Sequence, residues 1–316
     1  MTSPSPSVSP STGRMDQPSI APARAERRQT AIILRLVAVA CLAVMLAAAK
    51  LAGERGVHVV EALFYRQFLF LPVLLAWLWM GPGLMSVRTA RLGAHASRTA
   101  VGLAGMVLNF LTVTLLPLAE ATTIGFTVPI FATILSALVL KEATGLHRWG
   151  AVLAGFLGVL VMVQPGTMHF EPLGLSVAIA AAMVVAVVSI VLRQIGRTEA
   201  APTTVFWFTL FSLPPLGMAM LFFGQSHDLL SWILLGIIGL AGGAGQICLT
   251  ASLRLAPVSL VMSMDYTSLL WATLLGWLIW DHWPGPSTWA GAALIVASGL
   301  YIAWRERVRA IRREAA

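Results

Sequence analysis

Charged residues are scarce in this chain of 316 residues, and so are cysteine and tyrosine. Only 11% of the residues are charged, against about 25% in soluble domains, and 58% are hydrophobic. The two cysteines, Cys41 and Cys248, both lie within apolar runs, so neither indicates a disulfide framework or a metal site. This composition predicts a polytopic membrane protein rather than a soluble domain.

Enzyme signatures are also missing from the sequence. No phosphate-binding loop of the GK[ST] type occurs, which argues against a pump driven directly by ATP. The six histidines are scattered at helix ends and in loops, without the spacing of metal ligands. We therefore expect no enzymatic activity, no metal and no cofactor. The net charge of +8 does not indicate nucleic-acid binding, because most basic residues lie at the termini and in short loops.

What the chain does contain is ten long apolar runs, which we interpret as membrane-crossing helices. They lie roughly at 32–51, 58–80, 98–117, 120–140, 147–164, 172–192, 203–223, 231–253, 257–280 and 287–304. We expect an all-α integral membrane protein with ten transmembrane helices. Residues 1–30 are rich in Ser, Pro, Ala and Arg and are predicted to form a disordered cytosolic tail, with a basic cytosolic tail at 306–316.

The fourth run is the most informative of the ten. Twenty uncharged residues separate Glu120 from Lys141, with Gly125 and Pro129 near the middle. Breaks of this kind occur in membranes where neighbouring helices or a cavity satisfy the freed backbone groups. A similar stretch, Pro257–Asp281, returns 139 residues later.

This recurrence predicts two repeats, at residues 31–165 and 171–305. Gly53 and Gly196 correspond at an offset of 143 residues, and aromatic and proline positions follow at the same spacing. Each half holds five runs, an odd number, so the second half enters from the opposite side of the membrane. Inverted repeats of this kind build secondary transporters. The alternative is a chance likeness between runs rich in Leu and Ala.

Basic residues indicate the orientation. They gather in the N-terminal tail, after the second, fourth, sixth and eighth runs, and after the tenth, whereas the opposite side holds only Lys50 and Arg55. The positive-inside rule then places both termini in the cytoplasm. We expect a multi-pass protein of the inner (plasma) membrane.

Polar side chains at membrane depth are costly and usually face a cavity or a partner. The candidate residues of a substrate cavity are Glu61, Tyr65, Arg66, Asn109, Glu120, Thr127, Trp207, Gln246, Asp265, Tyr266 and Trp271.

Four of these side chains are ionisable, and each has an alternative interpretation. Glu61 and Glu120 lie in the first turns of helices, where a carboxylate complements the helix dipole. Arg66 lies deeper and needs a counter-charge, either Glu120, Asp265 or an anionic group of a substrate, unless it snorkels to the interface.

Asp265 is the proton-coupling candidate. It lies far from the end of the ninth run, with no charge nearby in sequence, and deep placement disfavours the charged form of a carboxylate. Trp207 and Trp271 are candidates for an aromatic wall around a flat or cationic substrate, and core packing explains either equally well.

Two long stretches carry a family resemblance. The segment LPLAEATTIGFTVPIFATILSALVLKE followed by RWGAVLAGFLGVLVMVQPG resembles the first repeat of EamA-type transporters in the drug/metabolite transporter superfamily. The segment APVSLVMSMDYTSLLWATLLGWLIWDHWPGPSTWAGAALIVASGLYIA is similar to the second, and EALFYRQFLFLP looks like the family's second helix, with Glu61 and Arg66 at matching positions. In the second repeat Asp281 stands where the family more often has Glu.

The resemblance covers about residues 30–305 and implies two inverted five-helix repeats around a central substrate cavity, with alternating access. We therefore expect a secondary transporter of a small organic metabolite, such as an amino acid or a cofactor-like molecule, and favour export. The alternative is an uptake or exchange carrier for a cofactor such as S-adenosylmethionine. A lipid enzyme or a non-transporting scaffold fits less well. The expected partners are the substrate and the lipid bilayer, with protons and a homodimer left open.

Overall fold

The computed structural model describes residues 20–81, 83–139, 146–163, 171–195, 198–255 and 263–314. Every regular element in these ranges is a helix, as predicted. The elements are α1 (Ile20–Glu54), α2 (Val59–Met80), η1 (Leu84–Val87), α3 (Leu92–Leu115), α4 (Leu118–Gly125), α5 (Val128–Val139), α6 (Leu146–Val163), α7 (Pro172–Ile195), α8 (Ala201–Phe223), α9 (Leu229–Leu255), η2 (Ser263–Thr267), α11 (Ser268–Trp280) and α12 (Pro286–Glu314).

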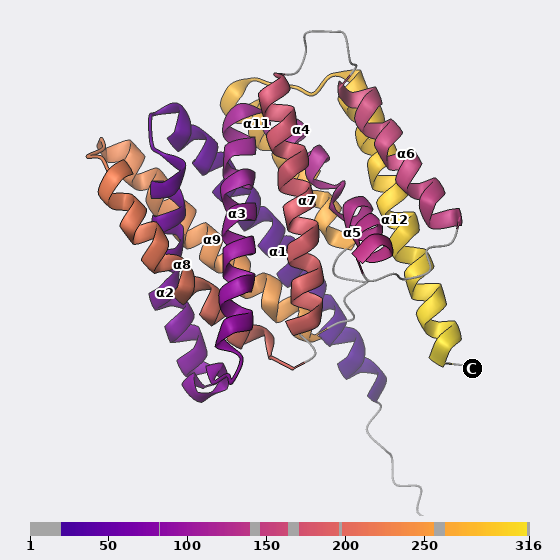
Figure 1. Ribbon diagram of the computed structural model, residues 1–316, viewed down its shortest axis with the longest axis horizontal. Coiled ribbons are helices and arrows are strands. Elements are labelled where there is room, and N and C mark those ends of the chain that lie inside the picture. Colours follow the sequence, from indigo (N-terminus) through magenta and orange to yellow (C-terminus); the bar gives the residue numbers. More distant parts are fainter. Residues whose placement is uncertain are drawn as a thin grey trace, which may run out of the picture.

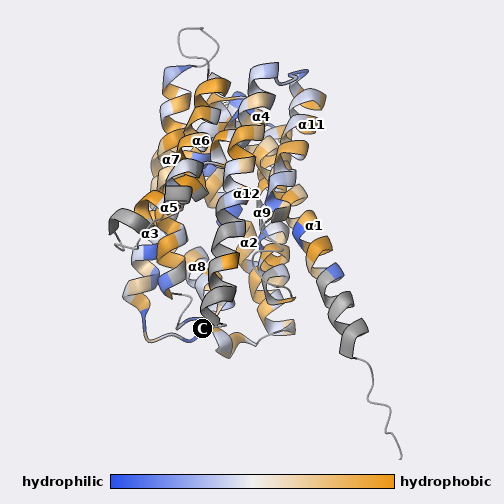
Figure 2. Cartoon of the chain, turned by 90° about the vertical axis from the view of Figure 1, so that its right-hand side faces the viewer, coloured by the Kyte–Doolittle hydropathy of each residue, from blue (hydrophilic) through white to orange (hydrophobic). Residues whose placement is uncertain are grey.

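Seven candidate membrane spans occur in the described residues, each long and apolar enough to cross a bilayer. One of them, Leu118–Leu135, runs through α4 into α5, and α6 contributes a shorter apolar helix at Val152–Met162. The outer surface exposes large apolar side chains such as Leu221 and Phe222, which are 82% and 83% accessible. Such a surface suits hydrocarbon rather than water. Figure 2 shows apolar residues along the helices, with hydrophilic residues mainly at the turns.

The first helix is longer than the sequence predicted. α1 begins at Ile20 rather than near residue 32, so the predicted disordered tail is too long where it reaches residue 30. Ala, Arg, Glu and Gln between these positions are good helix formers, and Pro22 lies in the first turn, where proline is tolerated. The final helix likewise continues to Glu314, through most of the predicted basic tail.

Helices of the two halves pack in matched pairs. α1 packs along α9, and the corresponding pair in the other half, α7 and α3, is also in contact. Three further pairs, α2 with α8, α4 with α11 and α6 with α12, join helices that occupy the same place in each half. Exchanging the first five spans with the last five therefore reproduces the same contacts, which is the pattern that a two-fold repeat produces.

Figure 1 shows how the chain runs between two faces. α1 begins and α12 ends on the lower side of the view, which we call the lower face; η1 also lies there. The turn between α1 and α2 and the loops that follow α8 and α11 lie on the opposite, upper face (Figure 1).

Two of the spans change their helical geometry within the described residues, and the places where they do so touch. α4 ends at Gly125, a turn follows, and α5 starts at Val128 with Pro129 in its first turn, where a missing N–H costs little. This confirms the break predicted in the fourth run. In the ninth span the 3₁₀ helix η2 precedes α11, and the ring of Tyr266 meets the ring of Phe126 edge to face at 5.0 Å. Positions 126 and 266 correspond at the 140-residue offset of the repeat.

Candidate functional site

Arg66, on α2, is a buried charged side chain in the interior of the bundle. Its residue is only 7% accessible, and its guanidinium contacts neutral atoms. Nε lies 3.2 Å from the sulfur of Met45 on α1, and Nη1 lies 3.4 Å from the sulfur of Met106 on α3. Nη1 also donates a hydrogen bond of 3.0 Å to Oε1 of Gln67. Arg66 is thus held within the bundle and does not snorkel to an interface.

Arg98 on α3 approaches the same region from below. Its Cζ lies 3.8 Å from the centre of the Phe208 ring on α8, a cation–π contact, while Nε and Nη1 have no hydrogen-bond partner. The side chain lies against Gly102, where a Cβ atom would come within 2.9 Å of Nη1. Arg98, Gly102 and Met106 are spaced four residues apart and so share one face of α3. The Arg66 guanidinium contacts Met106 and the Arg98 guanidinium contacts Gly102, one turn earlier on the same face of α3, so the two groups lie in the same part of the bundle.

We call Arg66, Gln67 and Arg98 the arginine centre. Among the described residues, no carboxylate lies within 4 Å of either guanidinium. The sequence offered Glu120 or Asp265 as the counter-charge of Arg66, and the structure places both carboxylates against other partners. That part of the prediction is wrong, because position along a helix does not reveal which face of the bundle a carboxylate reaches.

Asp265 forms the closest ion pair of the interior, with Arg35 on α1. Arg35 Nε and Nη2 donate to the two carboxylate oxygens at 2.6 and 2.5 Å, a bidentate arrangement. Arg35 is buried, whereas the side chain of Asp265 is 38% accessible. Sequence reasoning counted Arg35 only as a marker of the cytosolic side, because 230 residues separate it from Asp265.

Glu61 is fully buried on the upper side of the bundle. It closes a capping box with His58 at the start of α2, which is the helix-dipole alternative that the sequence left open. Its other oxygen, Oε1, accepts from the backbone N–H of Gln225 and lies 2.9 Å from Nε2 of His227. The carboxylate of Glu61 therefore caps α2 in the first half and also binds the α8–α9 loop in the second half. Sequence reasoning had noted His227 only as a scattered histidine.

Glu120 makes a similar link at the start of α4. Its Oε1 lies 3.2 Å from Nε2 of His282, in the loop after α11, and its Oε2 has no hydrogen-bond partner. Nearby, Lys50 donates to two backbone carbonyls at the end of α3, and Glu54 accepts from the indole of Trp280. The contacts of Glu120 with His282 and of Glu54 with Trp280 also join the two halves at the upper face.

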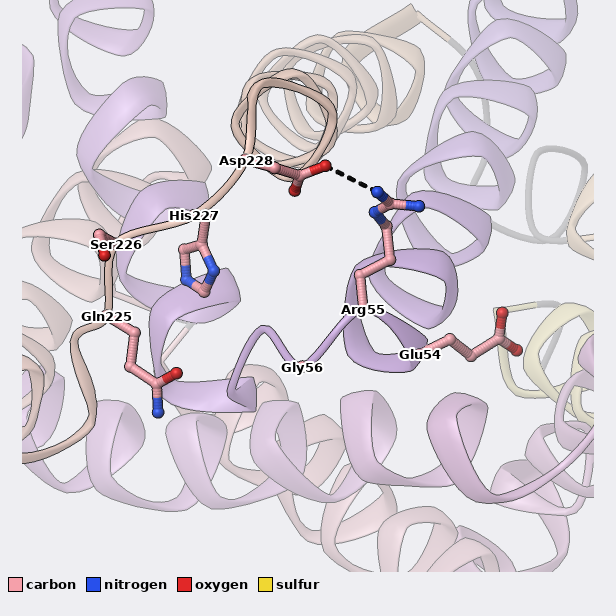
Figure 3. Close-up of a pocket in the computed structure, with 7 residues that line it drawn as sticks. All are labelled: Glu54, Arg55, Gly56, Gln225, Ser226, His227 and Asp228. Atoms are coloured by element: carbon pink, nitrogen blue, oxygen red, sulfur yellow. Dashed lines mark hydrogen bonds and ion pairs between the residues drawn. The ribbon is translucent and has the colours of Figure 1, made fainter.

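A polar pocket of about 520 Å³ opens between the α1–α2 turn and the α8–α9 loop. Arg55 and Asp228 bridge it with an ion pair of 2.7 Å, and His227 points into the space between the two segments (Figure 3). Asp228 also caps α9, since it accepts from the hydroxyl and the backbone N–H of Ser231. Hydrogen bonds from Ser231 and then from Arg55 lower the pKa of Asp228 to about 2.

The lower face is bridged in a comparable way. Thr89 and Arg91, which follow η1, donate to Glu199 and Thr198, which precede α8. His95 lies 3.7 Å from the same Glu199. Contacts between the halves therefore exist at both faces, with the arginine centre between them.

The predicted aromatic wall does not form. The indole of Trp207 donates to the carbonyl of Val87 in η1 and packs near His95, so this side chain lies towards the lower face. Trp271 lies on a different helix, α11, and is 36% accessible. The sequence could not show this, because position along a run does not reveal which neighbours a side chain meets.

The remaining predicted cavity residues lie at different places. Thr127 bonds to the carbonyl of Ile124 at the α4–α5 break, and Asn109 is exposed and bonds to its own helix. Tyr65 meets Trp232 edge to face at 5.3 Å. Gln246 is half-buried on α9, one turn after Gly242, the glycine that lies against Arg66. Only Gln246 is thus near the arginine centre.

These features define a class: a multi-pass helical membrane protein with two matched halves, interrupted spans and uncompensated charge in its interior. A sequence profile of the EamA-like transporter family matches the chain twice, over residues 29–164 and 172–304. The chain belongs to the EamA-like transporter family, and the resemblance to the drug/metabolite transporters is confirmed. It is therefore a membrane transporter of small metabolites.

Named relatives cover most of the chain. A riboflavin transporter of Vibrio cholerae is 29% identical over 69% of this chain and 73% of its own length. An S-adenosylmethionine uptake transporter of Rickettsia prowazekii is 27% identical over 82% of this chain and 87% of its own. A protein of known crystal structure shares 20% identity with a TM-score of 0.59, covering 87% of this chain and 97% of that one, which shows the common fold.

Proposed function

We propose that the protein is a secondary transporter that moves a cofactor-sized organic metabolite across the plasma membrane by alternating access. The observation that carries the proposal is the contact between Phe126, at the break of the fourth span, and Tyr266, in the 3₁₀ helix η2 of the ninth, at matching positions of the two halves. Interrupted helices that meet at the interface between repeats form the substrate sites of many transporters.

The bonds between the halves fit such a cycle. Arg55 and Asp228 tie the upper face, and Arg91 and Thr198 tie the lower face. Opening the centre to one side requires the polar contacts on that side to separate. Both of these pairs are exposed to water, where such contacts add little stability, so their separation costs little.

The lower face is assigned to the cytoplasm. The basic residues in the last part of α12 and those between α2 and α3 lie towards it, as the positive-inside rule requires. The two repeats, 31–165 and 171–305, then enter the membrane from opposite sides.

The substrate class rests on the relatives. Riboflavin and S-adenosylmethionine are both cofactor-sized molecules with flat ring systems, and the names of the relatives that carry them favour a cofactor over a simple amino acid. The sequence favoured export, whereas the names of the S-adenosylmethionine relatives favour uptake. A homodimer and proton coupling stay predictions.

Counterflow in proteoliposomes tests the proposal. Vesicles loaded with unlabelled riboflavin or S-adenosylmethionine are diluted into the labelled compound, and transient accumulation above that of empty vesicles is expected for one of them. Growth of a riboflavin-requiring strain with and without the gene then separates uptake from export. No counterflow of either compound, or of a wider panel of cofactors and amino acids, would contradict the proposal.

A further inference from the structure

The unpaired polar atoms of the arginine centre share one property. In the arginine centre, the atoms without a hydrogen-bond partner are Nε and Nη1 of Arg98 and Nε2 of Gln67, and all are donors. Gln67 is only 1% accessible, so its amide cannot turn to bulk water. A buried donor without an acceptor costs about 1–3 kcal/mol, and more when it is charged. Three such donors beside a second guanidinium therefore call for an acceptor that carries negative charge.

The protein does not supply that acceptor from its described residues. Asp265 is held by Arg35, Glu61 by His227 and His58, and Glu120 by His282. Two positively charged guanidinium groups one helical turn apart on α3 also repel each other, which favours an anion between them.

Glycines allow both arginine side chains to lie directly against the helix backbones. Gly102 lies under the Arg98 guanidinium, and Gly242 of α9 lies against Arg66, where a Cβ atom would come within 3.2 Å of Nε. The other contacts are the two thioethers of Met45 and Met106, soft groups that yield to a ligand. A planar guanidinium presents paired N–H groups that match carboxylate and phosphate oxygens.

We infer that Arg66, Gln67 and Arg98 together bind an anionic group of the transported metabolite, a carboxylate or a phosphate. The inference rests on the proposed function for the molecule that carries this group, but binding of the anion itself does not require transport. Arg98 and Gln67 are positions that the sequence did not select, since Arg98 counted there only as a cytosolic basic residue.

The first test measures binding of small anions. Purified protein without added lipid is heated in inorganic phosphate, in acetate and in chloride at equal ionic strength. Phosphate or acetate is expected to raise the unfolding midpoint of the wild type by a few °C over chloride. The shift should disappear in Arg66→Gln and in Arg98→Gln and should persist in Arg88→Gln, which removes an exposed positive charge on the nearby lower loop.

The unfolding midpoints of the variants in chloride show whether each variant is still folded. Because Arg98→Gln removes one of two buried charges that repel each other, its unfolding midpoint in chloride should equal or exceed that of the wild type. A missing anion effect in this variant would then reflect lost anion binding and not an unfolded protein. Absence of any anion-dependent shift in the wild type, or an equal shift in all three variants, would overturn the inference.

The second test compares ligands that differ only in the anionic group. Riboflavin 5′-phosphate is set against riboflavin, and S-adenosylmethionine against its decarboxylated analogue, as competitors of counterflow. The anionic member of a pair is expected to compete better by roughly ten- to a hundredfold, and Arg98→Gln to bring this ratio near one. The pair that shows the effect distinguishes phosphate from carboxylate.

The two proposals fail differently. Anion-dependent stabilisation without counterflow of any compound would leave the site intact and contradict the transport proposal. If the wild type and Arg98→Gln both show counterflow with the same preference for the anionic compound, the transport proposal stands and the anion site is contradicted.

Discussion

At the scale of single residues, the ion pair of Arg35 and Asp265 changes what the lone intramembrane aspartate is expected to do. Asp265→Asn keeps the size and polarity of the side chain but leaves the buried Arg35 with no counter-charge. We expect this variant to lose about 1–3 kcal/mol of stability, an estimate reduced for the partial exposure of Asp265. Thermal unfolding of the purified variant measures the loss.

The double variant Arg35→Met/Asp265→Leu is the matched control. Removal of both charges should recover most of the stability lost in Asp265→Asn, because no buried charge remains unpaired. Its transport separates the two roles: if Asp265 couples protons, both variants lose uphill accumulation and keep exchange at equilibrium. A stable Asp265→Asn with normal pH-driven accumulation would contradict both the structural and the coupling role.

Asp228 supports a prediction about pH. Its pKa is lowered from 3.8 to about 2, so its carboxylate contributes stability fully above pH 3.8 and loses that contribution as the pH falls towards 2. Asp228→Asn keeps an oxygen that can cap α9, but it removes the negative charge that pairs with Arg55. The unfolding midpoint of this variant should lie below that of the wild type by the same amount at pH 7 and pH 5, and the gap should narrow only in stronger acid. A gap that already closes between pH 7 and pH 5 would show that the ion pair does not set the difference.

The sequence predicted part of the set of residues that form the buried polar contacts. Depth in an apolar run was enough to select Arg66, Glu61, Glu120 and Asp265, because a charged side chain at membrane depth is costly unless it faces a partner or a cavity. Their long-range partners were not predictable, since these lie in loops or helices far along the chain. His227 and His282 carried no local signal, as histidines at helix ends are common.

At the scale of helices, the crossing of α6 and α12 depends on two glycines that face each other. A Cβ atom on Gly291 would lie 2.5 Å from the carbonyl oxygen of Gly158, and one on Gly158 would lie 2.9 Å from that of Gly291. Backbones in such contact cannot move apart locally, so Gly291→Ala should destabilise the protein by about 1–3 kcal/mol.

Gly150→Ala on α6 is the control, because a Cβ atom there meets nothing within 4 Å. This change should be neutral or stabilise the helix by up to about 1 kcal/mol. Equal behaviour of the two alanine variants in thermal unfolding would refute the close crossing.

The helices themselves were largely predictable. Hydropathy marked where the spans lie, and proline in the fourth run marked its break, because proline cannot continue a helix without a loss. The early start of α1 was missed because helix propensity in a polar segment is weaker than the hydrophobic signal that sequence reasoning followed. Which helices would pair was beyond the sequence, apart from what the repeat implies.

For the whole molecule, orientation is the first quantity to measure. If the lower face is cytoplasmic, a reporter active only outside the cytoplasm should be silent after Arg313 and active within residues 281–285 of the upper face. The reverse pattern would overturn the assignment by positive charge and with it the direction of the transport cycle. The sequence reading proposed the same test near Thr167, which lies outside the described residues.

The central claim, that the interior opens alternately to the two sides, is tested most directly by the accessibility of one position beside the arginine centre. In a chain with Cys41 and Cys248 replaced by alanine, Gln246→Cys is labelled with a membrane-impermeant maleimide in right-side-out and in inside-out vesicles. The account predicts that Gln246→Cys is labelled from both sides. A compound that is transported in the counterflow test should change both labelling rates. Phe222→Cys, on the outer surface, should stay unlabelled. Labelling of Gln246→Cys from one side only, at a rate that no transported compound changes, would contradict it.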